Sequence, residues 1–196
     1  MLHPLFMPTY GMILYMAAML VRTPNLPSIY IYTSVITTFV LTALIPIILM
    51  LILWKRGSIS SLHIDNASER TTPYIYTLIC FGFWCYFVGG ILKMPVVWLV
   101  VAIGATAALL AVTIINRWWK ISAHLTALGG LLGGAFSIAL YYSALPTLLI
   151  IGILIVSLLL MYARLYLNAH TPMQVVCGYI LGLLCTFTPN LIIYHA

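Results

Sequence analysis

Seven apolar runs dominate this sequence, and each is close to the ~20 residues that a helix needs to cross the hydrocarbon core of a bilayer. They cover residues 5–21, 30–54, 73–92, 96–116, 122–142, 146–163 and 172–194. Helices are expected because a helix pairs every backbone N–H and C=O within one open-ended segment. The strands of a membrane β-barrel would instead alternate apolar and polar residues. The sequence therefore predicts an all-α, polytopic membrane bundle of about six to seven helices, forming one domain over residues 1–196.

Charged side chains are scarce: the 196 residues include eight Lys or Arg and two Asp or Glu, which is 5% of the chain. Soluble domains carry about 25% charged residues, and nucleic-acid-binding proteins display clustered basic residues on a polar surface. A soluble enzyme and a nucleic-acid partner are therefore both excluded. The four cysteines all fall inside apolar runs, where they are interpreted as small buried hydrophobic residues.

The cations are unevenly distributed between the two faces that seven crossings create. The N-terminus and loops 55–72, 117–120 and 164–171 share one face, and this face carries Lys55, Arg56, Arg70, Arg117, Lys120 and Arg164. The positive-inside rule would place it in the cytoplasm, at the inner membrane if the protein is bacterial. If Arg117, Lys120 and Arg164 instead bind a substrate, three cations remain on this face and two, Arg22 and Lys93, lie on the other. The charge bias then no longer decides the orientation.

Two features predict how the helices bend and meet. Pro46 lies inside the run 30–54 and predicts a kink, because proline lacks an N–H and clashes with the preceding turn. Closely spaced glycines predict that the fifth and seventh helices are neighbours, and they also allow an oligomer to form. The glycine pairs are Gly129 with Gly133, Gly130 with Gly134, and Gly178 with Gly182.

Two short stretches, 120–124 and 164–170, carry the candidate chemistry. Each places a histidine, His124 or His170, at the start of a membrane helix on the same face, beside a cation. Ser122 is the expected N-cap of the fifth helix, and Thr171-Pro-Met-Gln174 reads as a capping box that opens the seventh. Free N–H groups at two helix starts, together with fixed cations, favour an oxyanion such as phosphate.

Two histidines beside a phosphate suggest phosphoryl transfer. One can attack phosphorus and form a phosphohistidine, and the other can protonate the departing oxygen. Cations and helix ends would stabilise the charge of the transition state. His3, His63 and His195 are interpreted as solvated loop or terminal residues, and Arg70 is a candidate for covering the site from the long loop.

Over residues of about 115–190 the chain resembles the type 2 phosphatidic acid phosphatases (PAP2), which share a fold with vanadium haloperoxidases. The third family motif is Ser-Arg, five residues, His, three residues, Asp; here Ala163-Arg164 is followed at those spacings by His170 and Gln174. The second motif is Pro-Ser-Gly-His, which matches Ile-Ser-Ala-His at 121–124. The resemblance implies that His170 is the nucleophile, His124 the general acid, and Arg164 and Ser122 phosphate contacts.

The chain departs from the family at three places. The first motif, Lys, six residues, Arg-Pro, is absent, and Arg117 and Lys120 are expected to replace its charges. Ala163 stands where the motif has Ser. Gln174 stands where the motif has the Asp that orients the nucleophile; an amide can hold a histidine tautomer but cannot compensate imidazolium charge.

The resulting hypothesis is a membrane phosphatase that hydrolyses a lipid phosphate or pyrophosphate without a metal or other cofactor, with membrane lipids as its surroundings. One alternative is a family member that has lost catalysis and binds phospholipid or serves as a structural partner. The other is a small transporter, for which Pro46 is the one hint of a broken helix.

Overall fold

Helices make up most of the described chain, which in this computed structural model comprises residues 3–60, 67–142 and 147–195. The long helices are α1 (Met7–Arg22), α2 (Ser28–Phe39), α3 (Ile45–Lys55), α4 (Thr71–Tyr86), α5 (Val96–Ile115), α6 (Ala123–Tyr142), α7 (Thr147–Tyr166) and α8 (Pro172–His195). Short 3-10 or π segments are η1 (Pro4–Phe6), η2 (Val40–Leu44), η3 (Ala67–Arg70) and η4 (Phe87–Ile91). These elements join into seven helical spans that are long and apolar enough to cross a membrane. The predicted all-α membrane bundle is therefore confirmed.

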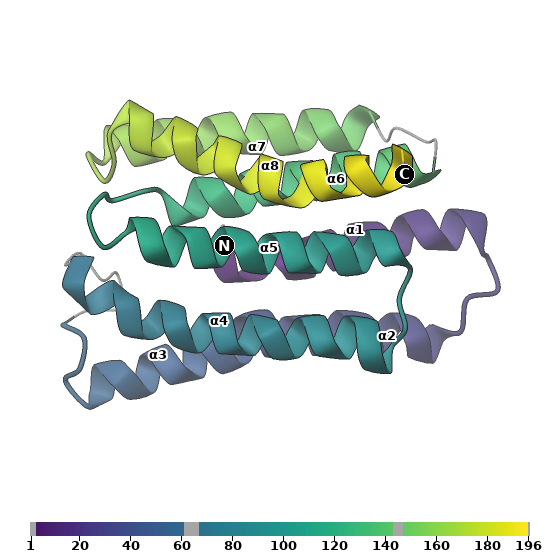
Figure 1. The fold of residues 1–196 in the computed structure, drawn as a ribbon, viewed down its shortest axis with the longest axis horizontal. Helices are drawn as coiled ribbons and strands as arrows, with labels where there is room; N and C mark the ends of the chain where they lie inside the picture. Colours follow the sequence, from purple (N-terminus) through teal and green to yellow (C-terminus); the bar gives the residue numbers. More distant parts are fainter. Residues whose placement is uncertain (1–2, 61–66, 143–146, 196) are drawn as a thin grey trace.

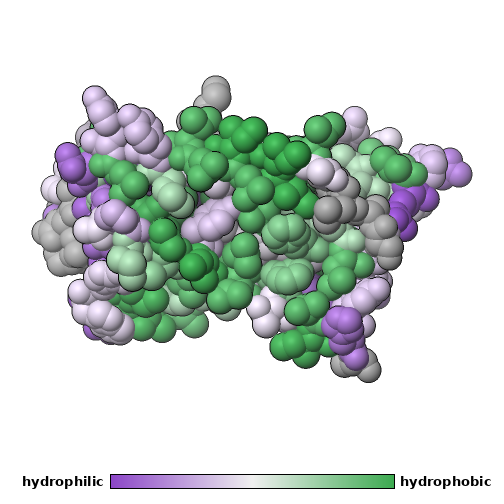
Figure 2. Space-filling model, turned by 90° about the horizontal axis from the view of Figure 1, so that it is seen from above, coloured by the Kyte–Doolittle hydropathy of each residue, from purple (hydrophilic) through white to green (hydrophobic). Residues whose placement is uncertain are grey.

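The helices run side by side along the long axis of the molecule (Figure 1). The C-terminal ends of α3, α5 and α7 lie at one end, and those of α1, α4 and α6 at the other, as the alternation of seven crossings predicts. Apolar residues cover much of the middle of the face in Figure 2, and hydrophilic residues gather toward the two ends. This distribution is typical of an integral, multi-pass membrane protein.

The observed helix bounds follow the predicted runs closely, with one consequential difference. Helix α7 continues to Tyr166, three residues beyond the predicted end. Arg164 therefore belongs to the last turn of a helix rather than to a loop. The predicted start of this span at Pro146, together with His63 and Asp65, lies outside the described residues.

The break predicted at Pro46 takes the form of a π turn. The N–H of Ile45 donates to the carbonyl of Val40, five residues earlier, and Pro46 is buried at the start of α3. A π turn is a common response to a residue that cannot join the i→i−4 ladder. Thr38 and Thr42, the buried threonines of this region, donate to carbonyls of their own helix at 2.8 Å.

Helices α6 and α8 make the most extensive contact among the described elements, as the glycine spacing predicts. A methyl group on Gly133 would lie 2.5 Å from the carbonyl oxygen of Leu183, and one on Gly178 would lie 2.8 Å from that of Ser122. On Gly129 and Gly182 it would overlap backbone atoms of the partner helix. The close approach therefore depends on glycine, and it positions the start of α6 against the start of α8.

Candidate functional site

The connection between α7 and α8 is a tight helix C-cap that positions both Arg164 and His170. Asn168 adopts the left-handed conformation, with φ of 51°. The N–H of Ala169 donates to Arg164 O at 3.1 Å, and that of Asn168 donates to Leu165 O at 3.0 Å. These are the two hydrogen bonds of a Schellman motif, in which Asn is one of the residues that tolerate positive φ. The motif reverses the chain directly between the cation and the histidine.

The capping box predicted at the start of α8 is confirmed. The N–H of Thr171 donates to Gln174 Oε1 at 3.0 Å, and the N–H of Gln174 approaches Thr171 Oγ1 at 3.4 Å. Because a backbone N–H can only donate, the amide of Gln174 is held with its oxygen toward Thr171. The same oxygen is thereby available to a second donor.

That second donor is His170. Its Nδ1 lies 3.3 Å from Gln174 Oε1 and 3.1 Å from the carbonyl oxygen of Lys120. Both neighbours are acceptors, so Nδ1 carries the hydrogen in the neutral ring, and Nε2 holds a free lone pair. The ring is thus in the tautomer that a histidine nucleophile requires. The role of Gln174 in the capping box and its role in orienting His170 are compatible, since one oxygen accepts both hydrogen bonds.

The start of α6 is held against the same turn of α8. The N–H of Ser122 donates to Gln174 O at 3.2 Å, and Gly178 packs on the carbonyl of Ser122. His124, two residues later, is half-buried and lines a cavity that Arg164 and His170 also line. His124 and His170, 46 positions apart in the sequence, therefore line the same cavity because a backbone hydrogen bond joins the starts of their two helices.

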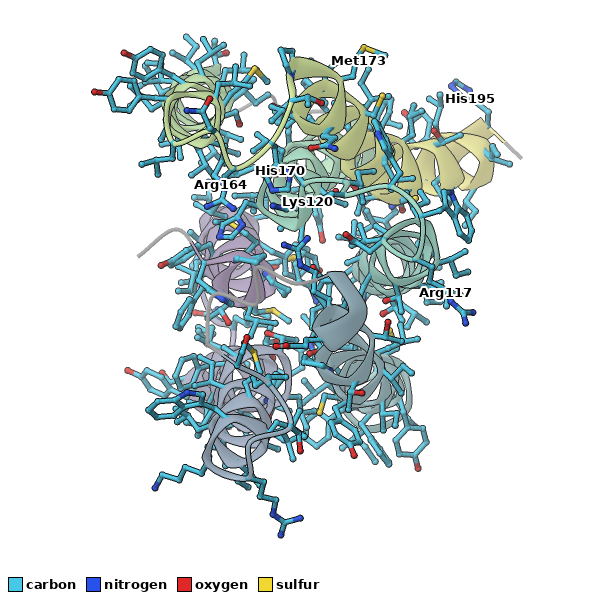
Figure 3. All side chains as sticks on the ribbon, turned by 90° about the vertical axis from the view of Figure 1, so that its left-hand side faces the viewer. Arg117, Lys120, Arg164, His170, Met173 and His195 are labelled. Carbon is cyan, nitrogen blue, oxygen red and sulfur yellow. The ribbon has the colours of Figure 1, made fainter. Side chains whose placement is uncertain are left out.

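The cavity has a volume of about 230 Å³ and brings five histidine and arginine side chains together. Three come from the predicted set: His124, Arg164 and His170. Two more come from the first half of the chain: His3, ahead of η1, and Arg70, at the end of η3. Figure 3 shows Arg164, His170 and Lys120 close together at this end of the bundle.

Arg70 lines the cavity, in agreement with its prediction as a candidate for covering the site. It is 8% exposed, and its guanidinium approaches Asn116 Oδ1 at 3.5 Å. The amide of Asn116 is oriented by a hydrogen bond from its Nδ2 to Val112 O at 3.0 Å, which turns the oxygen toward Arg70. The η3 segment therefore brings a cation to the cavity, although the first family motif is absent.

Arg117 does not join this group. It is exposed and points away from His170 at the edge of the molecule (Figure 3). The chain turns between α5 and α6, with the N–H of Arg117 bonded to Ile114 O at 3.2 Å, and this turn directs the side chain outward. Lys120 lies near His170, and its carbonyl oxygen accepts a hydrogen bond from Nδ1 of the imidazole ring.

Ser122 takes the position before α6 but not the predicted hydrogen bond. Its Oγ is fully buried and has no hydrogen-bond partner within the described residues, and Ser122 is absent from the cavity lining. The expected N-cap is therefore wrong in this detail. The docking of the Ser122 backbone on α8 holds this segment instead of a side-chain cap.

His3 corrects the interpretation of this residue as a solvated terminus. Its ring is half-buried and meets the ring of His124 edge-on, with centroids 5.8 Å apart. The N–H of Leu5 donates to His3 Nδ1 at 3.4 Å, so the ring hydrogen of neutral His3 is on Nε2. Burial lowers the pKa of His3. The available sequence signal for this role of His3 was its place before Pro4 and an apolar helix. Nothing in the local sequence indicated where that segment packs.

The electrostatics of His170 suit a neutral nucleophile. Burial is the main cause that lowers the pKa of His170, and the nearby Arg164 lowers it further, while the hydrogen bonds to Lys120 O and Gln174 oppose the change. The neutral ring is therefore favoured at neutral pH. Among residues 3–60, 67–142 and 147–195, no three His, Cys, Asp or Glu side chains lie close enough to hold a metal ion.

Comparison with known proteins supplies a family for the second half of the chain. The family model described as the PAP2 superfamily matches residues 100–195, a range that contains His124, Arg164, His170 and Gln174. No curated protein and no solved structure matched. His3 and Arg70, which line the same cavity, lie outside the matched range. Residues 100–195, with His124 and His170 near the starts of α6 and α8 and Arg164 in the last turn of α7, match the PAP2 superfamily as expected of a member of it.

Proposed function

We propose that this membrane protein is a phosphatase that hydrolyses a lipid phosphate or pyrophosphate. The observation that carries the proposal is one cavity that His124, His170, Arg70 and Arg164 line together. These residues lie at the end of the bundle where α6 and α8 begin. Two fixed guanidinium groups suit a phosphate dianion, because charge-assisted hydrogen bonds are strong and planar guanidinium matches phosphate oxygens.

The proposed reaction has two steps. Nε2 of His170 attacks phosphorus, the bond from phosphorus to the lipid oxygen breaks, and His124 gives its proton to that oxygen. Water then attacks the phosphohistidine, His124 takes the proton of the water, and inorganic phosphate leaves with His170 restored. Arg70 and Arg164 would stabilise the equatorial oxygens in both transition states. The phosphate itself brings the negative charge that protonated His124 needs beside Arg164.

The test is phosphate release by the purified full chain in detergent. Phosphatidic acid, alkyl phosphates and a prenyl pyrophosphate are the substrates, and His170→Ala is the principal variant. His195→Ala is the matched control, because His195 is exposed at the far end of α8. We expect His170→Ala to lose at least about 10³-fold in kcat and His195→Ala to match wild type. Equal rates in the two variants would overturn the proposal.

A second candidate is a member that binds a phospholipid without hydrolysing it. Gln174 and Ala163 favour this possibility, since neither supplies the carboxylate or hydroxyl of the third family motif. The same preparation separates the two functions. Binding of a non-hydrolysable alkyl phosphonate that Arg164→Ala weakens, with no phosphate released from any substrate, would establish binding alone.

We propose that the site faces the cytoplasm. With Arg70 and Arg164 lining the cavity, the loop surface at this end still carries Lys55, Arg56, Arg117 and Lys120, against Arg22 and Lys93 at the other. The positive-inside rule favours the more basic side as cytoplasmic. In intact cells, labelling of Lys93→Cys but not of Arg56→Cys by a membrane-impermeant thiol reagent is expected, and the reverse pattern would contradict the orientation.

A further inference from the structure

The cavity does not end at the cationic cluster but continues deep into the bundle. Its walls follow one face of each of four helices, at three- and four-residue spacing: Gly11, Leu14 and Ala18 of α1, Phe81 and Trp84 of α4, Ala105 of α5, and Gly134 and Ile138 of α6. From Val112 to Trp98 along α5 the lining spans 14 residue steps, or roughly 21 Å at the rise of a helix. The cavity is therefore a bore that covers about two-thirds of a hydrocarbon core.

The wall of the bore is largely apolar, and its threonine hydroxyls are bonded to backbone carbonyls. Thr77 Oγ1 donates to Pro73 O at 2.8 Å, Thr126 Oγ1 to Ser122 O at 2.9 Å, and Thr186 Oγ1 to Gly130 O at 3.0 Å. Each of these threonines, which line the bore, thus donates its hydroxyl hydrogen to a backbone carbonyl. A space with so few polar partners does not hold ordered water well, whereas a hydrocarbon chain would fill it.

Small residues make the bore and aromatic residues end it. Ala105, Gly130 and Gly134 leave room between α5 and α6. At the deep end, the ring of Trp98 stacks on Tyr15 with centroids 5.1 Å apart and meets Trp84 edge-on at 6.4 Å, and all three rings are buried. A volume of about 230 Å³ distributed over this depth is narrow, and it suits one extended hydrocarbon chain better than two side by side.

We infer that the bore receives the single hydrocarbon chain of a substrate whose phosphate sits between Arg70 and Arg164, so that single-chain phosphates are preferred over diacyl phospholipids. This inference rests on the proposed phosphatase function for its rate measurements. In a diacyl phosphate both chains leave the glycerol within a few bonds of the phosphate, and the bore admits one of them. In an alkyl or prenyl phosphate the whole apolar part can enter.

The test compares butyl phosphate, hexadecyl phosphate and dipalmitoyl phosphatidic acid as substrates of the purified full chain. Ala105→Leu narrows the bore midway along α5. Ala107→Leu is the matched control, because Ala107 lies on the exposed side of the same helix turn. We expect wild type to have a higher kcat/KM for hexadecyl phosphate than for the diacyl lipid. Ala105→Leu should lower the ratio of hexadecyl to butyl phosphate kcat/KM by about tenfold or more, and Ala107→Leu should leave this ratio unchanged.

Failure of the inference differs from failure of the function. If wild type hydrolyses these compounds but prefers the diacyl lipid, or if Ala105→Leu keeps the wild-type ratio, the inference is overturned while the phosphatase stands. If no compound releases phosphate, the phosphatase proposal fails. The affinity for hexadecyl phosphonate then tests whether the bore binds a hydrocarbon chain. Weaker binding by Ala105→Leu than by Ala107→Leu would support it, and equal binding would refute it.

Discussion

Gln174 Oε1 lies 3.3 Å from Nδ1 of His170 and accepts the N–H of Thr171 at 3.0 Å. One amide oxygen therefore caps a helix and holds the tautomer of a candidate nucleophile. This arrangement separates two roles that a carboxylate at the same position would combine, because the amide orients the ring but cannot neutralise it once it becomes positively charged.

Replacing Gln174 by Glu tests this separation. Glu keeps the length and the capping geometry and adds a negative charge beside Nδ1, so the pKa of His170 should rise by about one unit or more and the rate of phosphohistidine formation should increase. Gln174→Ala removes the orienting acceptor and should slow the reaction. Single-turnover phosphate release measures both changes. A slower Gln174→Glu enzyme would contradict the role assigned to this residue.

The pH dependence of the rate follows from the pKa of His170. The nucleophile must be neutral, and burial together with Arg164 lowers its pKa below the ordinary value of 6.5. The acid limb of kcat/KM should therefore have its midpoint below pH 6.5, with the rate falling as pH falls. Just below pH 6.5 the unfolded chain binds more protons at this residue than the folded protein, so stability should also decrease as pH falls. An acid limb centred above pH 6.5 would refute the assignment.

Substitution of Arg70 and substitution of Arg117 should affect kcat/KM differently, although both residues carry the same charge. Arg70 is buried in the cavity lining, whereas Arg117 is exposed outside it. Loss of a charge-assisted phosphate contact costs about 1.5–3 kcal/mol, so Arg70→Ala should lower kcat/KM by roughly 10–150-fold, and Arg117→Ala should change it little. The same loss in both variants would show that Arg117 reaches the substrate after all.

The left-handed residue Asn168 links the α7 cap to the site. A β-branched side chain resists φ of 51°, so Asn168→Val should destabilise the protein by about 1–2 kcal/mol and lower activity by displacing His170. Glycine accepts this conformation, so Asn168→Gly should keep both the stability and the activity of the wild type. Thermal unfolding in detergent with parallel rate measurements tests the pair. If the two variants prove equally stable, the cap does not control the site.

Much of the architecture was predictable because it depends on local order along the chain. The length of the apolar runs predicted seven spans, the spacing of Gly129, Gly133 and Gly178 predicted that α6 and α8 are neighbours, and Thr171 with Gln174 predicted the capping box. Each signal involves residues within one helix or one turn. The expectations for Arg117 and for the Ser122 cap failed because the side-chain direction at a connection depends on how that connection is docked.

The sequence by itself determined that this chain forms a membrane helix bundle with two histidines at helix starts on one face. Only the tertiary structure decided which cations join them. His3 and Arg70 reach the cavity across sequence separations of more than 90 residues from Arg164 and His170, through the packing of α1 and α4 against α5 and α6. The bore likewise exists only because small faces of four helices meet. Helix periodicity reports which side of a helix is apolar, but the partner that covers that side, or the space left uncovered, depends on the packing of the whole bundle.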